Sequence, residues 1–123
     1  MSLENKISKW ISDYLDKSGN DCLVVGVSGG IDSALTSTLC ARTDRKTILV
    51  TMPIHQNIDE TNRGIKHIKW LKSKYENISH LHIDLTNVYD SLEDAVPINF
   101  KTDLALANTR ARIRMTNLYL ISN

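Results

Sequence analysis

A glycine- and serine-rich stretch, residues 26–33 (GVSGGIDS), leads directly from a short apolar, β-branched run into a segment of helical composition. Such an apolar run is typical of a strand buried on both faces of a parallel sheet. A strand, a tight glycine turn and a helix in immediate succession form the repeating unit of α/β folds. The chain is therefore predicted to be an α/β domain with a loop at the carboxyl end of its first strand.

This loop is predicted to bind phosphate. Glycines let the backbone turn sharply and let an anion approach closely, while free N–H groups and the positive end of the following helix attract phosphate oxygens. A carboxylate would repel phosphate unless a divalent cation stood between them, so Asp32 indicates bound Mg²⁺. The loop is not of the Walker A type, because no lysine precedes its last serine. The candidate residues are Gly26, Val27, Ser28, Gly29, Gly30, Ile31, Asp32 and Ser33.

The rest of the chain alternates strand and helix patterns around this loop. Helices are predicted over residues 3–15, 34–42, 59–75, 86–96 and 103–122, and strands over 21–27, 47–52 and 80–85. Gly19 is expected to stop the first helix and Asp103 to cap the last one. The predicted buried stripe of the last helix is Leu104, Ala107, Ala111, Met115 and Leu118. Together these patterns predict an open, doubly wound parallel sheet.

Only three strands are predicted, although an open doubly wound sheet normally continues beyond its first strand. An unpaired, hydrophobic edge is a liability that natural folds avoid. We therefore expect residues 1–123 to be the N-terminal portion of a longer nucleotide-binding domain, incomplete at its C-terminal side.

Composition excludes several classes of function. Fifteen Lys and Arg against fourteen Asp and Glu give a formal net charge of +1, which provides no bulk attraction for nucleic acid. No apolar run approaches the roughly 20 residues that span a bilayer. The chain is thus expected to be cytoplasmic, with no membrane or nucleic-acid partner.

A second motif, residues 108–115 (NTRARIRM), lies in the last predicted helix. Helical spacing places Arg110 and Arg114 on one face, and Arg112 nearly opposite them, on the face of Asn108. An arginine one turn from an asparagine suits a phosphate or carboxylate of a dinucleotide.

The pattern SGGxDS resembles the pyrophosphate loop of the ATP pyrophosphatase superfamily, whose fold is of the adenine nucleotide alpha hydrolase type. Joined to N-x-x-A-R-x-R-M, it resembles the ammonia-dependent NAD synthetases. The resemblance implies a homodimeric ligase that amidates deamido-NAD with ammonia and ATP through an NAD-adenylate, releasing AMP and pyrophosphate. It implies that residues 26–33 and Gln56 bind ATP, that Asp32 binds Mg²⁺, and that Arg112 and Asn108 contact deamido-NAD.

Two other interpretations remain open. One is a different ATP pyrophosphatase that modifies tRNA, although the basic extension or reactive cysteine pair expected of it is not seen in the sequence. The other is a nucleotide-binding fragment without activity. His80 and His82 alternate along the third predicted strand, but no third metal ligand is indicated beside them.

Overall fold

The computed structural model describes residues 1–122. Its three parallel strands are β1 (Leu23–Gly26), β2 (Thr47–Thr51) and β3 (Ile78–His82), in the spatial order β1-β2-β3. In register, Leu23 pairs with Thr47 and Thr47 with Ile78. The helices are α1 (Leu3–Ser18), α2 (Ile31–Ala41), α3 (Ile58–Lys74), α4 (Thr86–Ala95), the short 3-10 helix η1 (Ile98–Phe100) and α5 (Asp103–Ser122).

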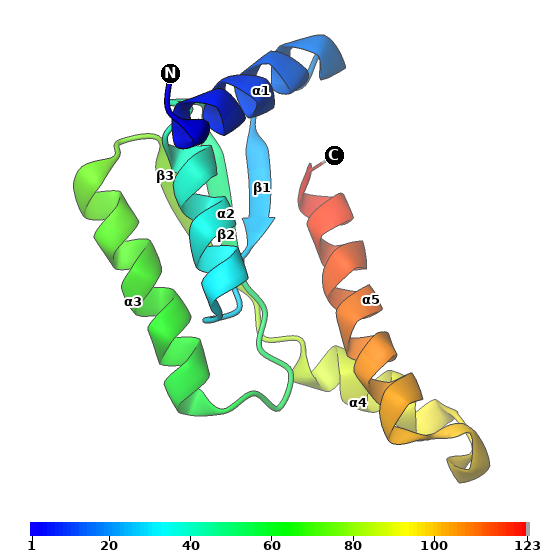
Figure 1. The fold of residues 1–123 in the computed structure, drawn as a ribbon. Helices are drawn as coiled ribbons and strands as arrows, with labels where there is room; N and C mark the ends of the chain where they lie inside the picture. Colours follow the sequence, from blue (N-terminus) through cyan, green and yellow to red (C-terminus); the bar gives the residue numbers. More distant parts are fainter. Residues whose placement is uncertain (123) are drawn as a thin grey trace.

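Helices cover both faces of the sheet, as Figure 1 shows. On one face α2 and α3 enclose a core that includes Ala41, Leu49 and Ile68, all fully buried. On the other face a second core around Val50 and Tyr89 packs against α4 and α5. The prediction of a doubly wound α/β sheet is thereby confirmed, with β1 as an edge strand that α5 contacts.

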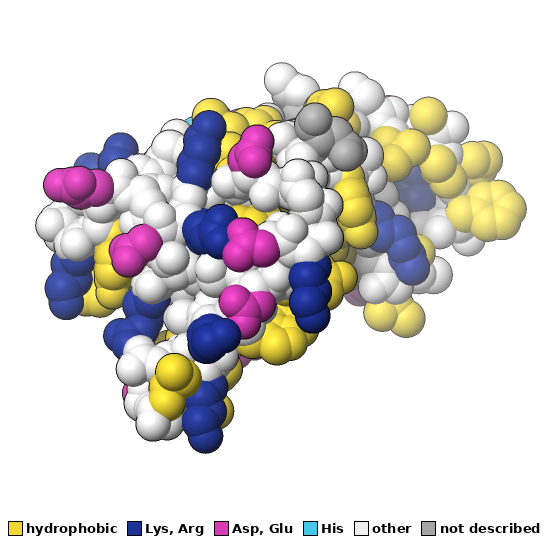
Figure 2. Space-filling model, turned by 90° about the horizontal axis from the view of Figure 1, so that it is seen from above, with side chains coloured by type: hydrophobic (Ala, Val, Ile, Leu, Met, Phe, Trp, Pro, Cys, Tyr) yellow, Lys and Arg dark blue, Asp and Glu magenta, His cyan; other side chains and the backbone are white. Residues whose placement is uncertain are grey.

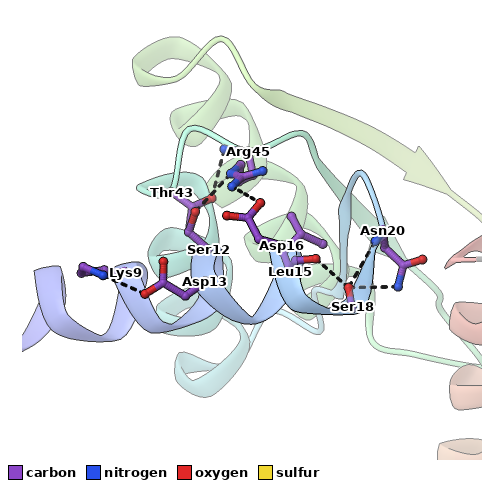
Figure 3. Close-up of polar contacts among 9 residues, drawn as sticks. All are labelled: Lys9, Ser12, Asp13, Leu15, Asp16, Ser18, Asn20, Thr43 and Arg45. Carbon is purple, nitrogen blue, oxygen red and sulfur yellow. Dashed lines mark hydrogen bonds and ion pairs between the residues drawn. The ribbon is translucent and has the colours of Figure 1, made fainter.

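Helix α1 crosses one end of the sheet and packs on α2. It ends as predicted at Gly19, whose φ of 74° is left-handed. Arg45, between α2 and β2, ties α1 down: its Nε donates to Ser12 Oγ at 3.1 Å, and its guanidinium pairs with the Asp16 carboxylate (Figure 3). None of the helices in residues 1–122 is long and apolar enough to cross a membrane.

Two predictions about the ends of elements were wrong. Strand β3 ends at His82 and not at residue 85, because the chain there turns to run alongside the β2–α3 connection, with the Leu85 N–H donating to the Pro53 carbonyl at 2.9 Å. Thr102, not Asp103, caps α5, and its Oγ1 accepts the Ala105 N–H at 3.1 Å.

The predicted buried face of α5 was also wrong. Leu104 is 72% exposed and Met115 is 52% exposed. The residues that pack against the core are instead Leu106, Ile113, Leu118 and Ile121, of which only Leu118 belongs to the predicted stripe. Apolar residues occur all around this helix, so their spacing alone could not select the correct face.

Candidate functional site

The phosphate loop occupies residues 27–30, between the end of β1 and the start of α2. Gly29 has a φ of 94°, and a Cβ there would lie 2.2 Å from the Glu60 carbonyl oxygen of α3. Gly64, one turn further along α3, completes this close approach, because a Cβ on it would meet the Gly29 nitrogen at 3.3 Å. Two glycines on separate elements thus let the loop lie directly on α3.

Serine hydroxyls fix the shape of this loop from within. Ser28 Oγ accepts the Gly30 N–H at 3.2 Å, and Ser33 Oγ accepts the Ser28 N–H at 3.1 Å. The Ser33 hydroxyl lies 3.2 Å from both the Gly30 carbonyl oxygen and Ser28 Oγ. The loop is therefore preorganised without a ligand, which lowers the entropic cost of binding one.

Helix α2 begins with its positive end open. Its N-cap is Gly30, which supplies no side-chain cap, and its first helical hydrogen bond is donated by the Ala34 N–H to the Gly30 carbonyl. Ile31 and Asp32, in the first turn, are exposed. An uncapped helix start after a preformed glycine loop is the geometry in which backbone N–H groups hold phosphate oxygens.

A pocket of about 500 Å³ opens beside the loop. Its walls come from the end of β1, the β2–α3 loop (residues 52–57), the first turn of α3 and the inner side of α5. The polar residues that line it include Ser28, Gln56, Glu60, Arg110 and Arg114. Gln56 reaches the phosphate loop itself, and its Nε2 donates to the Ser28 carbonyl at 2.8 Å.

Arg110 and Arg114 bring two cations to this pocket from consecutive turns of α5. Arg114 Nε donates to the Met52 carbonyl at 2.9 Å, and Arg110 Nη1 lies 3.3 Å from the Tyr89 hydroxyl. Burial and then Arg110 lower the pKa of Arg114, whereas the Glu60 carboxylate raises it. Because arginine stays protonated throughout the physiological range, the pocket carries two fixed positive charges beside the phosphate loop.

The structure brings some predicted site residues together and separates others. Gly26, Val27, Ser28 and Gln56 line the pocket, and the remaining residues of 26–33 continue from it into α2. Arg112 and Asn108 lie elsewhere, because α5 turns them outward and both are exposed. The predicted opposition of Arg112 to Arg110 and Arg114 is therefore confirmed.

Arg112 lines a second groove, of about 520 Å³, between α4 and α5. Most of its lining is apolar and includes Val88, Leu92 and Leu120, and Asn108 is not part of it. Arg110, Arg114 and Glu60 were not predicted as site residues. The four-residue spacing of the two arginines indicated their shared face, but nothing in the sequence showed that this face turns toward the loop.

The metal prediction rests on Asp32 alone. Within residues 1–122, no group of three or more His, Cys, Asp or Glu side chains is placed to hold a metal ion. His80 and His82 both point at the buried Thr51 hydroxyl, with ring nitrogens at 2.9 and 2.7 Å from its Oγ1. These two histidines therefore satisfy a buried polar group of the sheet.

The comparisons with known proteins agree on one family. The family model described as NAD synthase matches residues 3–123. An NH(3)-dependent NAD(+) synthetase of Alkaliphilus metalliredigens is 31% identical over 96% of this chain and 50% of its own length. That of Mycoplasmopsis pulmonis is 33% identical over 93% of this chain and 42% of its own length. The chain thus spans about half the length of the curated relatives it matches.

Solved structures agree in fold. An NH3-dependent NAD synthetase from Campylobacter jejuni, in complex with the nitrate ion, superposes with a TM-score of 0.84 at 29% identity, over 97% of this chain and 50% of the other. An NMN synthetase from Francisella tularensis gives the same TM-score at 27% identity, over 96% and 48%. The residues that the family model matches include the three-stranded sheet and its glycine loop. The chain therefore belongs to the NAD synthase family.

Proposed function

We propose that residues 1–123 form the ATP-binding part of an ammonia-dependent NAD synthetase, an ATP pyrophosphatase-type domain. The reaction is the amidation of deamido-NAD to NAD with ammonia, through an NAD-adenylate, with release of AMP and pyrophosphate. The observation that carries this proposal is the preorganised, uncapped phosphate loop beside a pocket with two arginines, in a chain of this family. We place the reaction in the cytoplasm, where ATP and ammonia are available.

The loop binds the part of ATP that leaves as pyrophosphate. Its N–H groups and the start of α2 face the β- and γ-phosphates, and they offset negative charge that develops as the bond to the α-phosphate breaks. Gln56 supports this geometry through its bond to the Ser28 carbonyl. Arg114 and Arg110 face the same pocket and offer their charge to the α-phosphate or to the carboxylate that attacks it.

Asp32 fits a magnesium ion by its chemistry and position. Its carboxylate is exposed in the first turn of α2 and forms no ion pair within residues 1–122. Mg²⁺ prefers one or two carboxylates together with substrate phosphate oxygens, and when bound it neutralises phosphate charge. Within residues 1–122 Asp32 is the carboxylate proposed as a ligand, and ATP and water would supply further oxygen ligands.

Deamido-NAD binds on the outer face of α5, where Arg112 and Asn108 are exposed. We propose that a second copy of the chain completes this site in a homodimer. The groove that Arg112 lines has apolar walls, and Figure 2 shows hydrophobic side chains gathered at the end of the molecule formed by α4, η1 and α5. The face over α1 instead mixes both signs of charge, as solvated surfaces do.

A second candidate function uses the same chemistry on a smaller substrate. The Francisella tularensis protein of equal TM-score is named an NMN synthetase, which favours amidation of a mononucleotide as the alternative. None of the relatives and solved structures described above is named as a tRNA-modifying enzyme. A nucleotide-binding fragment without activity would share the loop and pocket but turn over no substrate.

The test is pyrophosphate release from Mg-ATP by this chain, measured with ammonium and with either deamido-NAD or nicotinate mononucleotide. Release that requires deamido-NAD supports the first proposal, and release that requires the mononucleotide favours the second. Mg-ATP binding without release in either mixture would favour the inactive fragment, and no binding of Mg-ATP would contradict all three.

A further inference from the structure

An ion pair outside the pocket holds the β2–α3 loop (residues 52–57) in place. His55 lies in that loop with a φ of 48°, a left-handed conformation that is uncommon outside glycine, although asparagine, aspartate and histidine adopt it more often than other residues do. Its Nε2 lies 2.6 Å from Asp90 Oδ1 on α4. Because an ionised carboxylate only accepts hydrogen bonds, the imidazole donates in this pair.

Two more contacts bind His55 to the start of α4. Its backbone N–H donates to Thr86 Oγ1 at 3.2 Å. Its ring packs edge-on against Tyr89, with ring centroids 6.0 Å apart. The left-handed backbone of His55 is thus held by three separate interactions with one helix, which is the condition under which such strain persists.

The residue that follows His55 is Gln56, the side chain that reaches the phosphate loop. Its Nε2 donates to the Ser28 carbonyl at 2.8 Å, and Ser28 in turn accepts the Gly30 N–H. A continuous series of contacts therefore runs from Asp90 through His55 and Gln56 to the backbone of the loop. A change in the backbone at His55 would swing Gln56 away from Ser28.

We infer that His55 and Asp90 are a positioning pair for the phosphate loop, acting through Gln56 and without touching the nucleotide. This inference rests on the proposed function only in naming ATP as the ligand. The His55 side chain is 56% exposed and the Asp90 side chain 42% exposed, so their bond contributes only modestly to stability.

The charges around His55 come from three elements. Asp90 and Tyr89 face it from α4, Arg110 of α5 packs on the Tyr89 ring at 5.6 Å, and Asp84 lies in the β3–α4 connection. Hydrogen bonds from Thr86 are the main cause of the lowered pKa of Asp84, to which His82 and His55 add. Asp90 is therefore the carboxylate that bonds to His55, and Asp84 adds only an attraction through space.

The experiment compares His55→Asn, Asp90→Asn and Asp94→Asn with the unmodified chain. Asparagine tolerates the left-handed backbone at residue 55 but is too short to reach Asp90, so His55→Asn removes the pair without adding strain. Asp94 is the matched control, because it is an exposed aspartate of α4 that forms no ion pair or side-chain hydrogen bond in residues 1–122. Denaturant unfolding first establishes that each variant is folded.

The first readout needs no nucleotide: it is the amide chemical shifts of Ser28, Gly29 and Gly30 at one fixed pH. We expect these signals to be the same in Asp94→Asn as in the unmodified chain. In His55→Asn and Asp90→Asn they should be displaced. The second readout is Mg-ATP affinity at pH 6, expected to fall about three- to fivefold in His55→Asn and Asp90→Asn only.

Unmoved loop signals in both variants would overturn the inference, whatever the affinity. Moved signals with unchanged affinity would also overturn it, since the pair would then shape the loop without serving the site. If the unmodified chain binds no Mg-ATP, the proposed function fails, and the amide signals alone decide whether the pair positions the loop.

Discussion

Replacing Gly29 with alanine tests the close contact on which the phosphate loop depends. A Cβ at residue 29 would lie 2.2 Å from the Glu60 carbonyl oxygen and 3.1 Å from its carbonyl carbon. Both atoms belong to the backbone of α3, so the conflict cannot be relieved by rotating a side chain. Either the loop or the first turn of α3 must move.

The magnitude follows from two contributions. A φ of 94° is unfavourable for alanine, at a cost of about 1–2 kcal/mol. Forcing an extra methyl group into a packed contact adds about 1–3 kcal/mol. We therefore expect Gly29→Ala to lower the free energy of unfolding by about 2–5 kcal/mol, measured by urea denaturation, and to weaken Mg-ATP binding at least tenfold.

Two other glycines separate these contributions. Gly19 has a φ of 74°, and nothing lies within 4 Å of a Cβ built there. Gly19→Ala therefore measures only the cost of placing alanine in a left-handed backbone. Gly30 has a φ of −88°, and its nearest atom, Ser28 Oγ, lies 3.5 Å from a Cβ, so Gly30→Ala should cost little. If Gly29→Ala were as stable as Gly19→Ala and bound Mg-ATP normally, the reasoning from the Gly29–Glu60 contact would be refuted.

Other predictions address the metal, the substrate face and the sheet. Asp32→Asn should abolish the Mg²⁺ dependence of ATP binding in a calorimetric titration, and unchanged Mg-ATP affinity would refute its proposed role. Arg112→Ala should weaken deamido-NAD binding about tenfold or more while sparing ATP, whereas equal loss of both would contradict the assignment of α5 faces. Burial, then His82 and Lys72, lower the pKa of His80, so the unfolded chain binds this proton first as pH falls. Stability should thus decline below about pH 6.5, and His80→Gln should flatten that decline in unfolding curves recorded from pH 5 to 7.5.

Much of the fold was predictable because its signals are local. Glycines and serines between an apolar run and a helix predict the phosphate loop, and the structure places the loop at those residues. The left-handed end of α1 at Gly19 was likewise predictable from one residue. These features depend on the backbone freedom of glycine and on short-range hydrogen bonds, which the sequence displays directly.

Features that depend on tertiary packing were not predictable. Leu104 and Met115 match a helical stripe but are exposed, because α5 turns a different side to the sheet. Apolar and polar residues alternate through residues 80–85, although β3 ends at His82. Beyond His82 the chain leaves the sheet but stays hydrogen-bonded to the β2–α3 loop, which the alternation did not reveal. For the same reason, the sequence could not show which side of α5 supplies arginines to the pocket.

The proposed function requires the loop at residues 27–30 and the start of α2 to hold the phosphates of ATP. An amide chemical-shift titration of this chain with Mg-ATP tests this requirement, because it locates binding residue by residue. We expect the largest changes at Ser28, Gly29, Gly30 and the first turn of α2, together with the side-chain amide of Gln56. Binding that perturbs the α4–α5 groove or α1 and leaves these signals in place would show that the loop does not hold the phosphates.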